Sequence, residues 1–147
     1  MKLGAGFLLL CQTTGKILTV LRNDAEPTWS ILGGGLEKYE TSLQCAKREL
    51  IEEADFIENR DYEIVSNRPI NIGNYTNFVY RTYLAVTKSE IIPKLNYEHS
   101  DYKWVDIDDI PHPRHFGVAQ LLSDEKCIKK IKSMYQDANG RSCCIKR

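Results

Sequence analysis

Three consecutive glycines stand directly before an acidic helical segment, and this junction constrains the fold more than any other part of the chain. Residues 33–35 leave the backbone free of side-chain cover, so it can come close to a ligand. A capping-box pattern, Thr-Ser-Leu-Gln, predicts that a helix begins near residue 41 and runs to about residue 54. Residues three and four apart share one side of a helix, so Glu49, Glu52 and Glu53 form a single stripe.

Three carboxylates in one stripe repel one another. Like charges at this spacing are unfavourable by a few tenths of a kcal/mol per pair, and a bound cation is a natural compensation. Hard oxygen ligands suit Mg²⁺, or Mn²⁺ as its substitute. An acidic helix face that is merely solvated is the alternative for Glu49, Glu52 and Glu53, and the wider spacing of the segment decides against it.

The wider spacing matches a known motif. From Gly34, five residues precede Glu40 and seven more precede Arg48, which opens the run Arg-Glu-Leu-Ile-Glu-Glu. Residues 34–56 thus resemble the Nudix box, G-x5-E-x7-R-E-U-x-E-E-x-G-U, where U is a bulky aliphatic or aromatic residue. Asp55 replaces the last glycine. Because Asp tolerates the left-handed backbone region better than most residues, we expect a structural cost and no lost catalytic group.

The resemblance to the MutT-like Nudix family implies both a fold and an activity. The implied fold is an α/β/α sandwich with a mixed sheet, in which the box forms a loop-helix-loop motif. The implied activity is hydrolysis of a nucleoside diphosphate linked to another moiety X. By the same resemblance, Glu49, Glu52 and Glu53 bind Mg²⁺ together with a main-chain carbonyl of Gly33 or Gly34. The resemblance also implies that Arg48 orients these glutamates.

The general base varies across the family between a box glutamate and an acid from a distant loop. Glu98 is the best distant candidate, because it lies six residues before Trp104 in an arrangement that resembles the E-x5-W of many members. A solvated loop acid is its alternative. Arg22, at the end of a predicted strand, is a candidate phosphate contact or a surface arginine. Trp104 and Tyr75 are candidates for stacking on a base, since every base presents a π-face.

Other residues receive plainer predictions. His99, His112 and His115 do not share helical metal-ligand spacing with carboxylates, and we interpret them as loop residues. Aromatic residues in strands usually pack in the core, which is where we expect Trp29 and Phe78.

Apolar runs and turn residues predict the remaining elements. Residues 4–11 and 16–22 are expected to form a hairpin, and residues 29–32 a short strand before the glycines. Two strands over 62–73 and 76–87 with a turn at 74–75, a strand over 101–107 and helical sequence after residue 113 complete the pattern. Residues 1–137 are predicted to be one Nudix domain, and residues 138–147 a polar tail.

Composition limits the partners. The chain has 20 lysines and arginines against 20 aspartates and glutamates, so no global basic field would attract a long nucleic acid. A capped RNA end stays open, and a small nucleotide-type substrate is favoured. Five cysteines without metal-site spacing predict a reducing, cytoplasmic setting. No segment is long enough to span a membrane, so no membrane partner is expected, and the sequence does not set the oligomeric state.

Two function classes follow. The first is a Mg²⁺-dependent hydrolase acting on a nucleoside triphosphate (ribo or deoxy), a dinucleoside polyphosphate, ADP-ribose or another nucleotide sugar. The alternative is a catalytically inactive Nudix-fold module that only binds nucleotides. Loss of activity on this fold usually removes part of Arg-Glu-x-x-Glu-Glu, which is intact here. A diphosphate isomerase would require additional Cys and Glu positions that the sequence does not identify.

Overall fold

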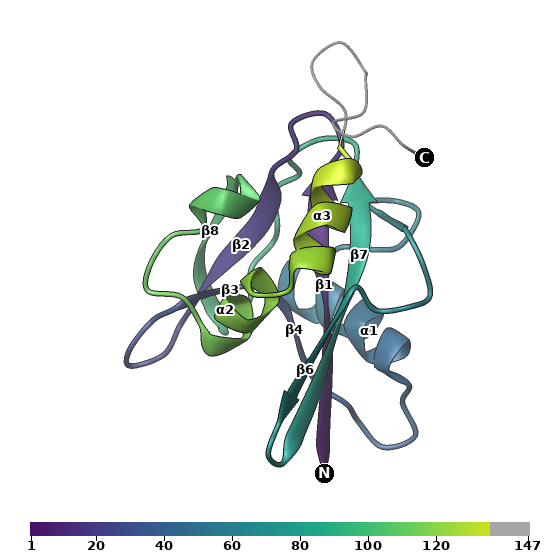
Figure 1. Cartoon of the computed structure of the whole chain (residues 1–147), viewed down its shortest axis with the longest axis vertical. Coiled ribbons are helices and arrows are strands. Elements are labelled where there is room, and N and C mark those ends of the chain that lie inside the picture. The colour runs from purple at the N-terminus through teal and green to yellow at the C-terminus, as the bar shows by residue number, and fades with distance from the viewer. Residues whose placement is uncertain (136–147) are drawn as a thin grey trace.

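A computed structural model describes residues 1–135, and its centre is a mixed β-sheet with helices on both faces (Figure 1). The strands of this part of the chain are β1 (Lys2–Cys11), β2 (Ile17–Arg22), β3 (Trp29–Ser30), β4 (Leu32–Gly35), β5 (Glu63–Ile64), β6 (Asn71–Tyr75), β7 (Phe78–Thr87) and β8 (His99–Val105). Its helices are α1 (Ser42–Ala54), α2 (Phe116–Leu122) and α3 (Glu125–Ser133), with a 3₁₀ turn, η1 (Ile107–Asp109).

β1 organises the sheet. It runs parallel to β7 along its whole length, and both strands are largely apolar, as expected for a central parallel pair. The other edge of β1 is shared by two strands: β4 pairs with residues 4–7, whereas β2 meets β1 only where Leu10 lies opposite Ile17. β2 continues outward with β3 and β8. The sheet therefore divides on this side, between β4 and β2.

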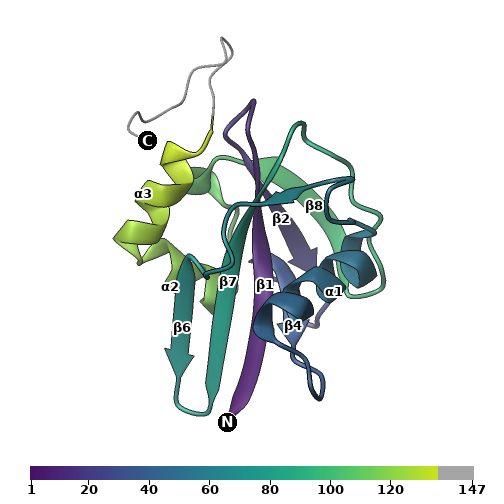
Figure 2. The ribbon, with the colours of Figure 1, turned by 90° about the vertical axis from the view of Figure 1, so that its right-hand side faces the viewer.

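α1 covers one face of the sheet, and α2 and α3 lie on the other (Figure 2). Successive side chains of a strand point to opposite faces. Phe7 and Leu9 accordingly pack in the core with Leu50 of α1, whereas Leu8 and Leu10 pack in the core beneath α2 and α3. The predicted α/β/α sandwich with a mixed sheet is confirmed.

Local signals set both ends of α1. Thr41 Oγ1 accepts a hydrogen bond from the Gln44 amide at 3.1 Å, and Gln44 Oε1 accepts one from the Thr41 amide at 2.9 Å, so the predicted capping box is present. At the other end Asp55 adopts the left-handed conformation, with φ 59° and ψ 37°. The replacement of glycine by Asp at this position therefore keeps the helix-closing geometry.

Two predictions for the region after α1 are wrong. The strand expected over 62–73 is broken into β5 and β6, because residues 65–70 contain Pro69, which cannot donate to a sheet hydrogen bond. The turn of the following hairpin lies at residues 76–77, since Tyr75 is paired with Phe78.

Other boundaries also differ. The predicted β1–β2 hairpin is limited to the strand ends that flank its turn, where the Cys11 amide donates to the Lys16 carbonyl at 2.8 Å. The strand expected over 101–107 begins at His99 and ends at Val105. Helical sequence after residue 113 forms two helices, because Asp124 caps the start of α3.

The predicted polar tail, residues 138–147, and the domain boundary at residue 137 lie outside the described residues. Within residues 1–135, the helices are too short or too polar for any of them to cross a bilayer.

Candidate functional site

Arg48 holds the acidic side chains around the glycine segment. Its Nε and Nη2 donate to the two carboxylate oxygens of Glu40 at 2.7 and 2.9 Å, which is a two-point grip. Nη1 donates to Glu49 at 3.0 Å and to Glu52 at 3.2 Å, and Nη2 also reaches the Gly35 carbonyl at 3.0 Å. The sequence predicted that Arg48 orients Glu49, Glu52 and Glu53, whereas the structure places its two-point grip on Glu40. Arg48 lowers the pKa of Glu40 accordingly.

Among the acidic residues that the structure describes, Glu53 is the most buried, at 1% exposure. Its carboxylate accepts a hydrogen bond from the Gly33 amide at 2.9 Å. Burial, reinforced by the charge of Glu49 and by the neighbouring Glu98, raises the pKa of Glu53 to about 9. The glycine segment and the end of α1 are thereby joined through this one carboxyl group.

Glu49 lies against the same segment. It is 7% exposed, and burial raises its pKa despite the opposing effect of Arg48. A Cβ at Gly34 would collide with the Glu49 carboxylate. Glycine is therefore required at this position so that the carboxylate can lie directly on the backbone.

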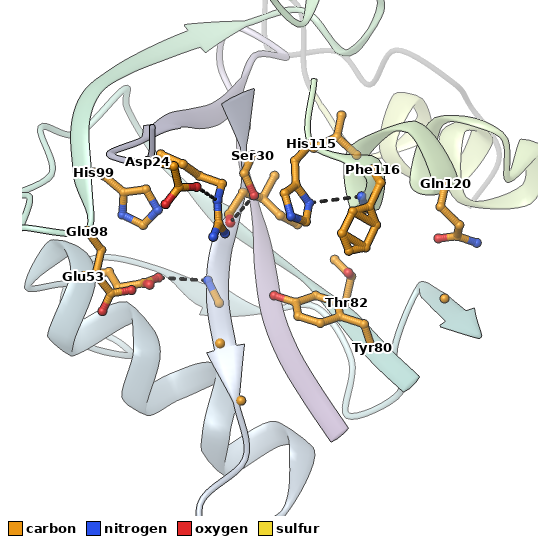
Figure 3. A pocket seen from close by; sticks show the side chains of 18 of the residues that line it. Asp24, Ser30, Glu53, Tyr80, Thr82, Glu98, His99, His115, Phe116 and Gln120 are labelled. Atoms are coloured by element: carbon orange, nitrogen blue, oxygen red, sulfur yellow. Dashed lines mark hydrogen bonds and ion pairs between the residues drawn. The ribbon is translucent and has the colours of Figure 1, made fainter. Parts of the chain in front are cut away.

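The structure brings Glu98 to Glu53 from a loop far along the chain (Figure 3). Asn96 fixes this loop: its Nδ2 donates to the Glu52 carbonyl at 3.0 Å, and its Oδ1 accepts from the Glu98 amide at 2.9 Å. The loop before β8 is thus tied to the end of α1, and the tie sets the position of Glu98.

The carboxylate and carbonyl oxygens around the glycine segment are the type of ligand that a hard divalent cation prefers. Gly33 and Glu53 are hydrogen-bonded to each other, and Glu49 and Glu52 share Arg48 Nη1. In the described residues, however, no three His, Cys, Asp or Glu side chains are already arranged to hold a metal ion. Two of the carboxylates point to Arg48, so a ligand cage would require them to turn. The exposed Glu52 side chain, at 49% exposure, has room to do so.

A pocket of about 420 Å³ extends from Glu53 and Glu98 toward the start of α2 (Figure 3). Arg22 is one of its lining residues, and its Nε donates to Asp24 at 2.7 Å. Trp104 lies elsewhere: its indole donates to the Ile91 carbonyl at 3.0 Å, and its ring packs against the core beneath α1. Arg22, the predicted phosphate contact, therefore lines the pocket, as does the stacking candidate Tyr75, whereas Trp104 does not.

Aromatic side chains form the end of the pocket remote from the carboxylates. Tyr75 stacks on Phe78 at 6.0 Å between ring centroids and meets Phe116 edge-on at 5.2 Å. Phe116 is 56% exposed, which is unusual for so large an apolar ring. Phe78, expected in the core, lines the pocket instead, whereas Trp29 is buried as expected.

Two histidines predicted to be loop residues have defined places on the pocket wall. His115 caps α2, and its Nδ1 accepts a hydrogen bond from the Gly117 amide at 3.1 Å. His99 begins β8 and is 8% exposed, and its Nδ1 has no hydrogen-bond partner among the described residues. Burial lowers the pKa of both imidazoles, which favours their neutral form. The Pro113-Arg-His-Phe sequence marks a helix start, but it does not indicate which site the helix faces.

Comparisons with known proteins bear on the family and on the fold. The sequence model of the NUDIX domain matches residues 1–124, and a comparison with curated proteins finds no match. Among solved structures, a C. elegans Ap4A hydrolase in a binary complex is similar over 86% of this chain and 93% of its own, with a TM-score of 0.69 and 19% identity. The Nudix hydrolase RenU from M. smegmatis has a TM-score of 0.70 and 21% identity over 86% of this chain and 84% of its own. An ADP-ribose pyrophosphatase from Streptococcus suis has a TM-score of 0.67 and 22% identity over 92% and 96%.

Proposed function

The chain belongs to the Nudix family of phosphoric-anhydride hydrolases, and on this premise we propose that it cleaves the diphosphate of a nucleoside diphosphate linked to a group X, with Mg²⁺. The observation that carries the proposal is the meeting of Glu53 and Glu98 at one end of a pocket whose other end is aromatic. A nucleoside diphosphate also has two such parts: a diphosphate, which would lie near the carboxylates with a metal ion, and a base, which would lie near the aromatic rings.

The residues around the glycine segment have separate proposed roles, and the first of these is to bind the metal ion. We assign a main-chain carbonyl of Gly33 or Gly34, with Glu49, Glu52 and Glu53, as the ligands of Mg²⁺ or of Mn²⁺ in its place. Bound there, the cation would supply charge neutralisation on the diphosphate and a more acidic water.

Arg48 keeps the carboxylates oriented before the cation arrives, through its bonds to Glu40, Glu49 and Glu52. Glu98 faces the Glu53 carboxyl from a loop that is anchored to α1. We propose Glu98 as the general base that accepts the proton of the attacking water.

Substrate recognition is proposed for the rest of the pocket. Phe116 and Tyr75 offer a stacking surface for a base, the role that the sequence suggested for Tyr75 and Trp104. Arg22 is proposed to contact a phosphate. The neighbours named for Ap4A and ADP-ribose support a dinucleoside polyphosphate or a nucleotide sugar, and a nucleoside triphosphate or a capped RNA end has the same diphosphate.

A cytoplasmic setting remains a prediction. Cys11, Cys45 and Cys127 are buried free thiols in the described part of the chain, which supports a reducing compartment.

The test is a screen of these nucleotide classes with the wild-type protein, with and without Mg²⁺. Mass spectrometry would identify the products. We expect a nucleoside monophosphate and the phosphorylated form of X, formed only with the divalent cation. Intact nucleotides throughout, with tight nucleotide binding, would favour a binding module over the proposed hydrolase.

A further inference from the structure

The sheet carries an unusual row of glycines beneath the pocket. Gly73 of β6, Gly4 of β1 and Gly35 of β4 occupy one row across the sheet, and Tyr80 of β7 is the remaining member of that row. Tyr80 therefore has no side chain beside it in the row. A bulky ring in this position is free to lie along the sheet and not stand upright from it.

The glycines define where the ring goes. A Cβ at Gly4 would meet Tyr80 Cδ1 at 2.8 Å, and a Cβ at Gly6 would meet the hydroxyl at 2.5 Å. A Cβ at Gly33 would also collide with the hydroxyl. The ring thus reaches from Gly4 across β1, and its hydroxyl ends at Gly33, whose amide donates to Glu53.

The Tyr80 hydroxyl is available for a hydrogen bond to a ligand. Tyr80 lines the pocket (Figure 3). Within residues 1–135, no hydrogen bond involves its hydroxyl. A phenol hydroxyl can donate a hydrogen bond as well as accept one. A donor is therefore available beside the glycine segment.

A diphosphate needs such donors here. Arg22 is the one lysine or arginine among the described residues that line the pocket, and it is already paired with Asp24. The neighbouring carboxylates repel phosphate oxygens. A neutral hydroxyl supplies a hydrogen bond to phosphate without adding charge beside the carboxylates.

We propose that the Tyr80 hydroxyl donates a hydrogen bond to a phosphate oxygen of the bound nucleotide, at the position where the aromatic half of the pocket meets the carboxylate half. This deepens the proposed function and rests on it. The glycine row then serves to clear the path of the Tyr80 ring to that position.

Tyr80→Phe tests the proposal because it keeps the ring and removes only the hydroxyl. Tyr83→Phe is the matched control: it removes a phenol hydroxyl from the same strand, on the opposite face, where Tyr83 packs beneath α1. Both variants would first be compared with the wild type by unfolding midpoint. Binding of AMP, GMP, CMP and UMP would then be titrated, with each corresponding nucleoside in parallel.

We expect Tyr80→Phe to weaken binding of the preferred monophosphate roughly 10- to 100-fold, the range for a hydrogen bond to a charged group. Binding of the corresponding nucleoside should change by less than about twofold, and Tyr83→Phe should match the wild type in both titrations. Equal monophosphate affinity in the two variants would overturn the proposal, as would an equal loss for nucleoside and monophosphate. A wild type that binds monophosphates but hydrolyses no nucleotide would overturn the proposed function, while these titrations would still decide the role of Tyr80.

Discussion

Replacing Arg48 by lysine should damage both stability and turnover although the charge is kept. Arg48 makes two bonds to Glu40 and further bonds to Glu49, Glu52 and the Gly35 carbonyl. A lysine ammonium is a compact point charge that cannot reproduce this planar fork. Because the Glu40 and Glu49 side chains are only 12% and 9% exposed, solvent would replace the lost bonds poorly.

The size of the effect follows from these contacts. A charge-assisted hydrogen bond contributes about 1.5 to 3 kcal/mol, and the ammonium recovers part of what is lost. We therefore expect the free energy of unfolding to fall by about 2 to 3 kcal/mol in Arg48→Lys. For a chain of this size, that corresponds to a midpoint lower by roughly 4 to 10 °C. Turnover should fall as well, because Glu49 and Glu52 lose the group that orients them.

Urea unfolding and steady-state kinetics would measure the two effects. Arg60→Lys is the control: Arg60 also pairs with a carboxylate, at 2.9 Å from Asp61, but its side chain is 55% exposed. The control should be indistinguishable from the wild type in both assays. If Arg48→Lys matched Arg60→Lys, Arg48 would be an ordinary surface charge and its orienting role would be refuted.

Three further predictions concern single residues. Glu98→Gln should lower turnover more than it raises KM, as expected for a group that acts mainly in the transition state; the opposite pattern would indicate a substrate contact only. Asp55→Gly should raise the free energy of unfolding, measured with urea, by about 0.5 to 1 kcal/mol, because glycine adopts the left-handed conformation of residue 55 without steric cost. A lower free energy of unfolding would refute the argument that Asp55 is strained in this conformation. The Asn71 side-chain amide donates a hydrogen bond to the Asp124 carboxylate and lowers the pKa of Asp124 in the folded state. The ionised Asp124 carboxylate therefore stabilises the fold at pH values above 3.8, its pKa in the unfolded chain, and this stabilisation is lost as the pH falls through the lower pKa of the folded state. Asp124→Ala should therefore differ most from the wild type in urea unfolding near pH 7 and least in strong acid, and a constant difference would contradict the assignment.

The sequence predicted those parts of the fold that depend on local signals. The capping box at Thr41 and the left-handed residue at Asp55 are each specified within a few residues, and both are present in the structure. The broken strand before β7 also has a local signal, Pro69, because proline cannot donate to a sheet hydrogen bond.

The aromatic half of the pocket depends on contacts between distant segments. Tyr80 acquires its place from glycines on three other strands, and Phe116 from the packing of α2 beside β6. Trp104 lies opposite Leu18 on the face that packs beneath α1, which is why it misses the pocket. Strand register, which decides these positions, is not readable from spacing within one segment.

The central claim, that the buried carboxylates carry out metal-dependent hydrolysis, is tested most directly by comparing Glu53→Gln with Glu63→Gln. Glu63 is an exposed glutamate on β5, outside the pocket. Turnover of the best substrate from the nucleotide screen, measured against Mg²⁺ concentration, should fall at least about a hundredfold in a folded Glu53→Gln protein and stay unchanged in Glu63→Gln. Near-normal, Mg²⁺-dependent turnover in Glu53→Gln would contradict the account.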